Sequence, residues 1–464
     1  MSLNKRSKYL LKNITIFTIS NFSTKLITFF LIPLYTWKLS TSEYGIVDLL
    51  FTISSFIYPL LTLNIVESVF RFSMDKNKED NKIIYNGIIC NIIGIVIGIL
   101  IIPITNIFEN YSDYSILFYL YVVSLSLSQT LLVFLKGQEK LKLFAIGNII
   151  NTTLVALFNI VFLLIFDLSI NGYFLAYILA NVVVIIYCFI FGKIKINLSK
   201  SNYDKNLLVN MLKYSIVLLP TSFMWWIINS SDRIMIASLI GNDANGIYAI
   251  SYKLPSLLTM LATIFNQAWM FSAITEKDSD DYQKYTNNVF SKLFIILSMS
   301  AIGLLGIIKP IFSIYVAPDY YEAWKYVPFL VFGYIFMTLS TFISTSYNVH
   351  KDSKGILFSG LFGAITNIFL NFLFIPLLGV SGAALATMFS YIVVFIYRLI
   401  DTKKYIKINI DLKHVFLITL VLISCVITYL DTIMNIVWCI IALIMILICY
   451  GKDTLSIINN IRKE

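Results

Sequence analysis

Long runs of apolar residues, separated by short polar segments, dominate the chain. Each run holds roughly 18 to 25 residues, the length that an α-helix needs to cross about 30 Å of hydrocarbon. The first run continues past Pro33 without a small-residue cleavage site, so we expect a retained helix and not a signal peptide. The pattern predicts fourteen transmembrane helices, near residues 11–34, 45–67, 83–105, 114–135, 144–166, 170–191, 214–240, 246–270, 288–308, 326–348, 355–377, 382–400, 414–430 and 432–450.

Composition points the same way. Of 464 residues, 58% are apolar and 13% charged, and the mean hydropathy is +0.83. A soluble domain has about a quarter charged residues, so this chain has too little polar surface for a water-soluble fold of its size. The five Cys and two His lie in or beside apolar runs, and we therefore expect neither a disulfide framework nor a metal site.

Positive charge is spread unevenly over the connecting segments. The net charge of +10 fits an anionic partner or nucleic acid, but it also fits membrane topology. If the N-terminal segment faces the cytoplasm, the segments on that side hold 29 of the 35 Lys and Arg residues, as the positive-inside rule requires. We therefore expect both termini in the cytoplasm and no nucleic-acid partner. Three cations fall inside predicted helices instead: Lys25, Arg233 and Lys253.

The chain repeats itself at an interval of about 200 residues. Glu-Tyr-Gly-Ile-Val-Asp at residues 43–48 corresponds to Ala-Asn-Gly-Ile-Tyr-Ala at 244–249, and related Gly-containing segments open the sixth and twelfth helices at 168–176 and 378–386. Six helices per copy give both copies one orientation, which is a parallel repeat. The predicted domains are an N-terminal six-helix lobe at residues 1–200, a C-terminal six-helix lobe at 201–405, and two additional helices with a cytoplasmic tail at 406–464.

Several short motifs are typical of one family. They are Asn-Ile-Phe-Leu-Asn at 367–371, Ile-Pro-Leu-Leu-Gly-Val-Ser-Gly-Ala-Ala-Leu-Ala-Thr at 375–387, Ser-Asp-Arg at 231–233 and Tyr-Lys at 252–253. With them the chain resembles the Wzx-type O-antigen and capsule repeat-unit flippases, polysaccharide transporters of the MOP exporter superfamily. The resemblance implies two six-helix bundles in the bacterial cytoplasmic membrane that export undecaprenyl-pyrophosphate-linked oligosaccharides. The expected partners are that oligosaccharide, membrane lipids and the polysaccharide polymerase machinery.

The three cations inside predicted helices, Lys25, Arg233 and Lys253, suit a substrate with a negatively charged pyrophosphate. A charge at the bilayer centre costs on the order of 2.5–3.5 kcal/mol, so each is expected to face a polar cavity. Polar residues recur at helical spacing around them on the first, second, seventh and eighth helices, which predicts one cavity between the lobes. Cations there would hold a pyrophosphate through charge-assisted hydrogen bonds. The predicted substrate-binding residues are Lys25, Arg233, Lys253, Asn21, Asn229, Trp226 and Tyr252.

Aromatic and acidic residues in the same helices leave alternatives open. Trp225 and Trp226 either stack on sugar rings or pack within the protein. Glu67 and Arg71 are four residues apart, a spacing that predicts an ion pair on one face of a helix. This pair either gates the cytoplasmic side or lies at the membrane surface. No cofactor is expected apart from a coupling cation, H⁺ or Na⁺. The coupling-ion or gating candidates are Asp48, Asp232, Glu67 and Arg71, the last two forming the ion pair.

Proline residues in the predicted cavity helices permit bending, because each removes a backbone hydrogen bond. They are Pro33, Pro59, Pro220 and Pro255. Together with the repeat they predict alternating access by movement of the two lobes. Three other functions stay open: a multidrug exporter, a peptidoglycan-precursor exporter of the same superfamily, and a membrane-embedded sugar polymerase. We expect a transporter and no catalytic residues.

Overall fold

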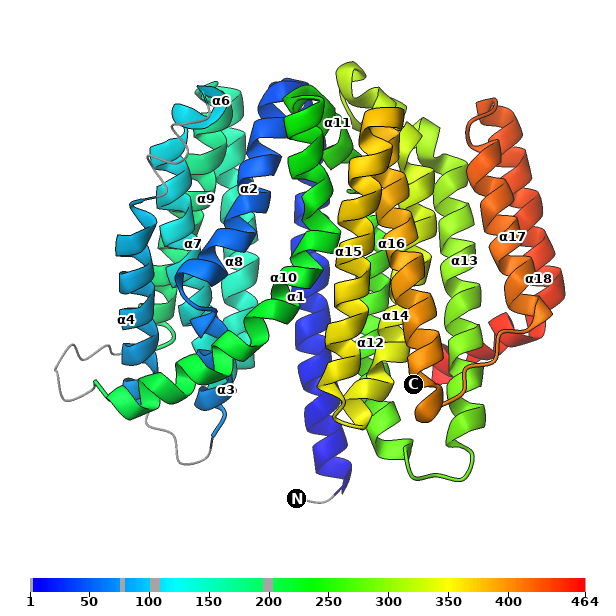
Figure 1. Cartoon of the computed structure of the whole chain (residues 1–464), viewed down its shortest axis with the longest axis horizontal. Coiled ribbons are helices and arrows are strands. Elements are labelled where there is room, and N and C mark those ends of the chain that lie inside the picture. Colours follow the sequence, from blue (N-terminus) through cyan, green and yellow to red (C-terminus); the bar gives the residue numbers. More distant parts are fainter. Residues whose placement is uncertain (1–2, 76–79, 101–108, 195–202, 464) are drawn as a thin grey trace. The chain divides into compact units, whose positions relative to one another are not determined.

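The chain folds as helices joined by short connections. The computed structural model describes residues 3–75, 80–100, 109–194 and 203–463, and every regular element in them is helical (Figure 1). The all-α, polytopic membrane fold predicted from sequence is confirmed. Two compact units, Met1–Phe223 and Met224–Glu464, divide within one long helix. The predicted lobe boundary at residue 200 lies outside the described residues, and the three-part division stays a prediction.

The first unit contains the helices coloured blue to green in Figure 1. Their bounds are α1 (Leu3–Lys38), α2 (Thr41–Leu61), α3 (Ile65–Ser73), α4 (Asp80–Gly98), α6 (Glu109–Ser112), α7 (Ser115–Gly137), α8 (Leu141–Asn159), the π-helical turn η1 (Ile160–Ile165), α9 (Ser169–Ile190) and α10 (Lys205–Leu239), which continues into the second unit. A capping box of Ser40 and Glu43 begins α2, because the two side chains satisfy backbone N–H groups that a helix start leaves without partners.

Polar side chains join the helices of the first unit inside an apolar core. Asn91 on α4 donates a hydrogen bond of 2.9 Å to Thr130 on α7. Asn181 on α9 donates to Ser124 on α7 at 3.2 Å and accepts from Asn151 on α8 at 3.0 Å. Each such bond contributes about 0.6 to 1.7 kcal/mol between membrane helices. Two asparagines therefore connect four helices of this unit.

The second unit contains the remaining helices, coloured green to red in Figure 1. Their bounds are α11 (Asn242–Ser251), α12 (Ser256–Glu276), α13 (Tyr282–Tyr315), the 3₁₀ helix η3 (Pro318–Tyr326), α14 (Val327–Val349), α15 (Ser353–Leu378), α16 (Val380–Asp401), the 3₁₀ turn η4 (Thr402–Lys404), α17 (Leu412–Ile427) and α18 (Thr432–Lys463).

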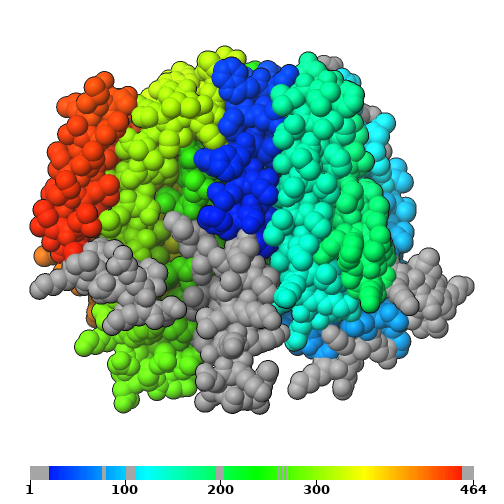
Figure 2. All heavy atoms as spheres, turned by 180° about the vertical axis from the view of Figure 1, so that it is seen from behind, coloured from blue at the N-terminus to red at the C-terminus, as the bar shows by residue number. Residues whose placement is uncertain are grey.

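Helix α14 is the central helix of the second unit. Of the 18-residue apolar stretch in the segment Pro318–Val349, 78% is buried within the protein, whereas an outer helix exposes one face to lipid. Helices α12, α13, α15 and α16 pack around it. Helices α17 and α18 pack on α13 at the edge of the unit, where Figure 2 shows α18 in red. The C-terminal pair is thus an outer addition to this unit.

Two glycines shape the turn between α15 and α16. Gly379 has φ of +60° and ψ of −139°, a conformation that side chains with a Cβ rarely adopt. At Gly382 a Cβ would collide with the backbone of Phe374 and Ile375, so the missing side chain lets α16 pack closely on α15. The Gly-Val-Ser-Gly motif used for the family resemblance therefore builds a tight helix–helix turn.

The predicted transmembrane helices correspond closely to the observed ones. Eleven helices of the described residues are long and apolar enough to cross a membrane, and α1, α12 and the shorter α17 occupy the other three predicted positions. The third predicted helix ends early: α4 stops at Gly98, and residues 101–105 lie outside the described part of the chain.

Two helices that were predicted to be continuous are interrupted in the structure. The second is split, because α2 ends at Leu61, two residues beyond Pro59, and α3 begins only after Leu63 and Asn64 adopt positive φ. The eighth is split between α11 and α12, whose N-cap is Pro255. Proline removes a backbone donor and clashes with the preceding turn, which explains both interruptions. In contrast, α1 and α10 continue through their prolines.

Candidate functional site

The C-terminal half of α10 presents polar side chains to α15 and α16. Asn229 accepts a hydrogen bond of 2.7 Å from the hydroxyl of Tyr391 on α16. Two residues further along, Ser231 donates one of 2.7 Å to Asn367 on α15. All of these groups belong to the second unit. This side of α10 therefore faces the protein interior.

Asp232 is fully buried among these contacts. Its Oδ2 accepts hydrogen bonds from the hydroxyls of Tyr248 at 2.7 Å, Tyr252 at 2.6 Å and Thr387 at 3.1 Å. Its Oδ1 accepts the backbone N–H of Arg233 at 2.9 Å. Burying a carboxylate is costly unless its oxygens are hydrogen-bonded. Donors from α10, α16 and the end of α11 meet that requirement.

Amide side chains of α15 extend this arrangement. Asn367 donates to the Thr387 hydroxyl at 3.5 Å and accepts from Asn371 at 3.0 Å. The other amide oxygen, Oδ1 of Asn371, is buried and accepts no hydrogen bond from the described residues. Carboxylate, hydroxyl and amide oxygens are the ligands that hard cations prefer. The set that we name the Asp232 network consists of Asp232, Tyr248, Tyr252, Asn367, Asn371 and Thr387.

Arg233 lies directly beside the Asp232 network. Its guanidinium carbon is 5.1 Å from the centre of the Tyr252 ring, a cation–π geometry that favours a positive charge on this face of the ring. Lys253 follows Tyr252 in the chain, in the break between α11 and α12, and both cations are half-buried. The structure therefore brings Arg233, Tyr252 and Asp232 together as one group.

The other predicted site residues belong to the first unit. Asn21 and Lys25 lie on an exposed face of α1, whereas Asp48 is buried in the second turn of α2. The predicted grouping of Lys25 with Arg233 and Lys253 involves residues of both units and stays a prediction.

The ion pair predicted between Glu67 and Arg71 was wrong. Both side chains are exposed on α3, and Arg71 instead bonds Asp75 at 2.6 Å. Glu67 lies four residues before Arg71 and Asp75 four residues after it. Both spacings place the two side chains on one face of the helix, so spacing alone allows either acid as the partner. Among the described residues Glu67 forms no ion pair. The pair therefore offers no geometry for a gate.

Two of the predicted sugar-binding residues are engaged within the protein. Asn229 donates to the backbone of Trp225 at 2.6 Å and accepts from Tyr391, so both ends of its amide are used. The Trp225 ring packs under the guanidinium of Arg398 at 5.3 Å. Trp225 therefore packs within the protein, and its stacking on sugar rings stays a prediction. Trp226 is half-buried.

Arg398 is a buried cation near the end of the helix predicted at residues 382–400. It lies inside α16 with 2% of its surface exposed. Its Nε donates to the Ser359 hydroxyl at 3.0 Å and its Nη1 to the backbone carbonyl of Ser340 at 2.9 Å. These bonds and the Trp225 ring join α14, α15, α16 and α10, so Arg398 acts as a packing residue.

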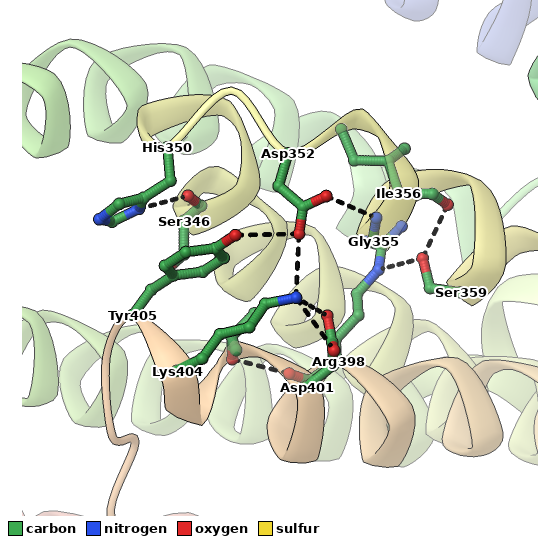
Figure 3. Close-up of polar contacts among 11 residues, drawn as sticks. Ser346, His350, Asp352, Gly355, Ile356, Ser359, Arg398, Asp401, Lys404 and Tyr405 are labelled. Atoms are coloured by element: carbon green, nitrogen blue, oxygen red, sulfur yellow. Dashed lines mark hydrogen bonds and ion pairs between the residues drawn. The ribbon is translucent and has the colours of Figure 1, made fainter.

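Figure 3 shows how polar groups connect the turn after α14 with the end of α16. Asp352 caps α15 by accepting the N–H of Gly355 at 3.1 Å and also accepts the Tyr405 hydroxyl at 3.0 Å. Lys404 pairs with Asp352 at 3.0 Å and with Asp401 at 3.2 Å. The hydrogen bond from Lys404, followed by that from Gly355, holds the pKa of Asp352 below its usual range. The cluster stabilises a turn.

The sequence argument missed most of the Asp232 network as a site. Asn367, Asn371, Thr387 and Tyr248 entered the sequence analysis only as residues of motifs. Helical spacing offered a signal, because Asn367 and Asn371 are four residues apart and lie on one face of α15. What spacing does not show is that this face meets Asp232 of α10.

Comparison with known proteins gives two matches along the chain. The profile of the family described as "Polysaccharide biosynthesis protein" matches residues 10–276. The profile described as "Lipid II flippase MurJ" matches residues 274–449.

Individual relatives have low sequence identity to this chain and cover different shares of it. An uncharacterized membrane protein of Methanocaldococcus jannaschii is 25% identical over 433 residues, covering 88% of this chain and all of that protein. A probable lipid II flippase MurJ of Thermotoga maritima is 24% identical over 174 residues, covering 36% of this chain and 37% of that protein.

Solved structures share the fold at low identity. A lipid II flippase MurJ in an inward closed conformation superposes with a TM-score of 0.74 at 14% identity, covering 95% of this chain and 99% of that one. An inward-facing multidrug resistance MATE family transporter of the MOP superfamily superposes with a TM-score of 0.65 at 13% identity, covering 84% of this chain and 95% of that one. These two likenesses support the fold alone.

Proposed function

The chain belongs to the polysaccharide biosynthesis protein family of the MOP superfamily, and on this basis we propose that it is a flippase for lipid-linked oligosaccharides. In this proposal it moves undecaprenyl-pyrophosphate-linked repeat units across the bacterial cytoplasmic membrane by alternating access, with both termini in the cytoplasm. The products supply O-antigen or capsule assembly and pass to the polymerase machinery. The protein acts as a transporter and carries out no chemical step.

The observation that carries the proposal is the contact of Arg233 with Tyr252 beside buried Asp232. A guanidinium inside a membrane-spanning helix is costly and is usually retained for function. The aromatic ring positions Arg233 on one side, and a planar guanidinium suits bidentate binding of a pyrophosphate. Lys25 and Lys253 are the further anion-binding residues in this proposal.

Asp232 is the candidate site for the coupling cation. Its oxygens, the Thr387 hydroxyl and the amide oxygens of Asn367 and Asn371 form an oxygen-rich set that suits H⁺ or Na⁺. While Asp232 is ionised, its charge attracts Arg233 and opposes an incoming anion. Neutralisation by a proton or Na⁺ removes that opposition and strengthens anion binding at Arg233. Cation and substrate binding are thereby coupled through neighbouring residues.

A second candidate function is export of the peptidoglycan precursor. The match of residues 274–449 to the lipid II flippase profile favours it. That substrate also carries a lipid-linked pyrophosphate, so the same cations would bind it. A multidrug exporter that handles cations would need a cavity dominated by acids, whereas in this chain Arg233 adjoins Asp232 and Lys253 follows Tyr252 in the sequence.

The test uses a strain whose surface polysaccharide depends on this gene. Arg233→Ala, Lys25→Ala and Lys253→Ala are each expected to reduce surface polysaccharide, and Arg233→Lys is expected to retain part of it because the charge remains. Lys284→Ala, which removes an exposed lysine at the start of α13, is the matched control. Surface polysaccharide that persists with all three cations replaced would disprove the proposal. Rescue of cells depleted of their lipid II flippase, with no effect on polysaccharide, would favour the second candidate.

A further inference from the structure

The second unit contains a polar cavity of about 380 Å³ that shares no residue with the Asp232 network. Asn288, Ser291 and Lys292 of α13 line one side of it. The opposite side is formed by the start of α17 and the residue before it, including Lys413 and His414.

The wall of this cavity is fixed in place by amide side chains. The segment that precedes α17 lies along α13, where Asn287 donates to the carbonyl of Lys407 at 2.9 Å and accepts the N–H of Asn409 at 2.7 Å. Gln283 binds both the N–H and the carbonyl of Lys407. These bonds hold the segment that leads to the α17 side of the cavity against α13.

His414 directs a hydrogen-bond donor into the cavity. Its Nδ1 accepts the backbone N–H of Asp411 at 3.1 Å as part of the α17 capping box. In the neutral ring the proton is therefore on Nε2, which lies 3.0 Å from the Ser291 oxygen and donates to it. The Ser291 hydroxyl consequently accepts from His414 and keeps its own proton for another acceptor.

Two lysines give the cavity a positive charge. Lys292 is half-buried and Lys413 is exposed, with its Nζ 5.9 Å from the centre of the Tyr450 ring. Among the described residues neither lysine forms an ion pair. The opposing charge is Asp411, the N-cap residue of α17, whose backbone carbonyl accepts the N–H of His414 at 2.9 Å. The lining therefore carries a net positive charge with donors turned inward.

The position of the cavity favours an anion attached to a lipid. Helix α13 has 34 residues, about 51 Å of helix, so it extends roughly 10 Å beyond the hydrocarbon at each end. Lys292 lies in its third turn, near the boundary between head groups and acyl chains. Ile295 and Leu417 form an apolar part of the lining, and the adjoining α18 exposes Ile441 and Ile448.

We propose that this cavity binds the phosphate head group of an anionic membrane phospholipid. The phosphate accepts charge-assisted hydrogen bonds from Lys292 and Lys413 and a further one from Ser291. The acyl chains then run along the exposed apolar faces of α17 and α18. A bound lipid would join α13 to the C-terminal helix pair.

The test measures lipid retention by the full-length protein purified in detergent, using native mass spectrometry. Phosphatidylglycerol, phosphatidylcholine and inorganic phosphate are added separately. The double variant Lys292→Gln/Lys413→Gln is compared with Lys403→Gln/Lys407→Gln, which removes two exposed lysines outside the cavity. Phosphatidylglycerol should bind the first variant about tenfold more weakly than the wild type and the second as well as the wild type.

Several results of this experiment would overturn the proposal that the cavity binds a phospholipid. Equal retention by both double variants would overturn it, as would equal binding of inorganic phosphate and phosphatidylglycerol, which would indicate a site for free anions. Phosphatidylcholine should bind more weakly, because its choline adds a positive charge near the lysines. If the cavity variant does not fold, Ser291→Ala keeps both charges, and its retention of phosphatidylglycerol should fall several-fold.

Discussion

The hydroxyl of Tyr252 donates a hydrogen bond of 2.6 Å to Oδ2 of Asp232. The same ring lies 5.1 Å from the guanidinium carbon of Arg233. One side chain thus contacts both the candidate cation site and the candidate anion-binding residue. A change of charge or hydrogen bonding at Asp232 is therefore expected to affect Arg233 through the Tyr252 side chain that contacts both.

Asp232→Asn should abolish the response of transport to a cation gradient. The amide keeps the shape of the carboxylate but removes its charge and its capacity to bind H⁺ or Na⁺. The measurement is translocation of a lipid-linked oligosaccharide in proteoliposomes with an imposed Na⁺ or pH gradient. Tyr252→Phe keeps the ring beside Arg233 and removes one hydrogen bond, so it should weaken cation dependence by about tenfold. A variant Asp232→Asn that still responds to both gradients would exclude this residue as the coupling site.

Arg398→Ala should destabilise the second unit by about 3 kcal/mol. The substitution leaves a cavity under Trp225 and removes the hydrogen bonds to Ser359 and Ser340. Lys404→Ala is the matched comparison, because it also removes one cation close to the end of α16. It breaks partly exposed ion pairs, worth about 0.2–1 kcal/mol each, and the ring contacts with Tyr347 and Tyr405. Thermal unfolding in detergent measures both variants. Equal losses would show that burial of Arg398 contributes nothing beyond a surface charge.

The sequence pattern predicted the helices because each one is determined by the residues of its own segment. Apolar run length fixes where a chain can cross a bilayer, and the positions of α7, α9 and α16 follow from it. The prolines were recognised as sites of bending, but Pro59 and Pro255 interrupt helices whereas Pro33 and Pro220 do not. That difference depends on the packing around each residue, and periodicity carries no information about it.

The candidate site was only partly predictable for the same reason. Arg233 and Asp232 stood out because charges are rare in apolar runs. Thr387 and Asn371 did not, since small polar residues are common in membrane helices and usually join one helix to another. Arg398 lies near the end of an apolar run, and spacing does not reveal its burial, because that burial depends on contacts such as the one with Trp225, 173 positions earlier in the chain. Contacts between distant segments decide these roles.

Asp352→Asn should lower stability at neutral pH and have progressively less effect in acid. The pKa of Asp352 is lowered, first by the hydrogen bond from Lys404 and then by that from Gly355. A folded-state pKa below the unfolded value of about 3.9 stabilises the fold above that value, and the contribution is lost as pH falls through the folded-state pKa. The measurement is the thermal midpoint from pH 7 to pH 3.

The control for this pH series is Asp280→Asn. Asp280 is exposed and forms no hydrogen bond or ion pair with the described residues, so its replacement should leave the midpoint unchanged throughout. A constant difference between Asp352→Asn and the wild type over the whole range would show that the lost contribution does not depend on ionisation of the carboxyl.

Gly379→Ala should destabilise the protein although nothing lies near the added methyl group. A Cβ at this position meets no atom within 4 Å, so the cost is conformational and arises from φ of +60° with ψ of −139°. Residues held in such sparsely populated regions cost about 1–3 kcal/mol. Gly303→Ala is the matched control, because its Cβ also meets nothing within 4 Å but Gly303 lies inside α13. There alanine should stabilise by about 0.5–1 kcal/mol, so thermal unfolding of the two variants should shift in opposite directions. Shifts of the same sign would mean that the α15–α16 turn does not require glycine.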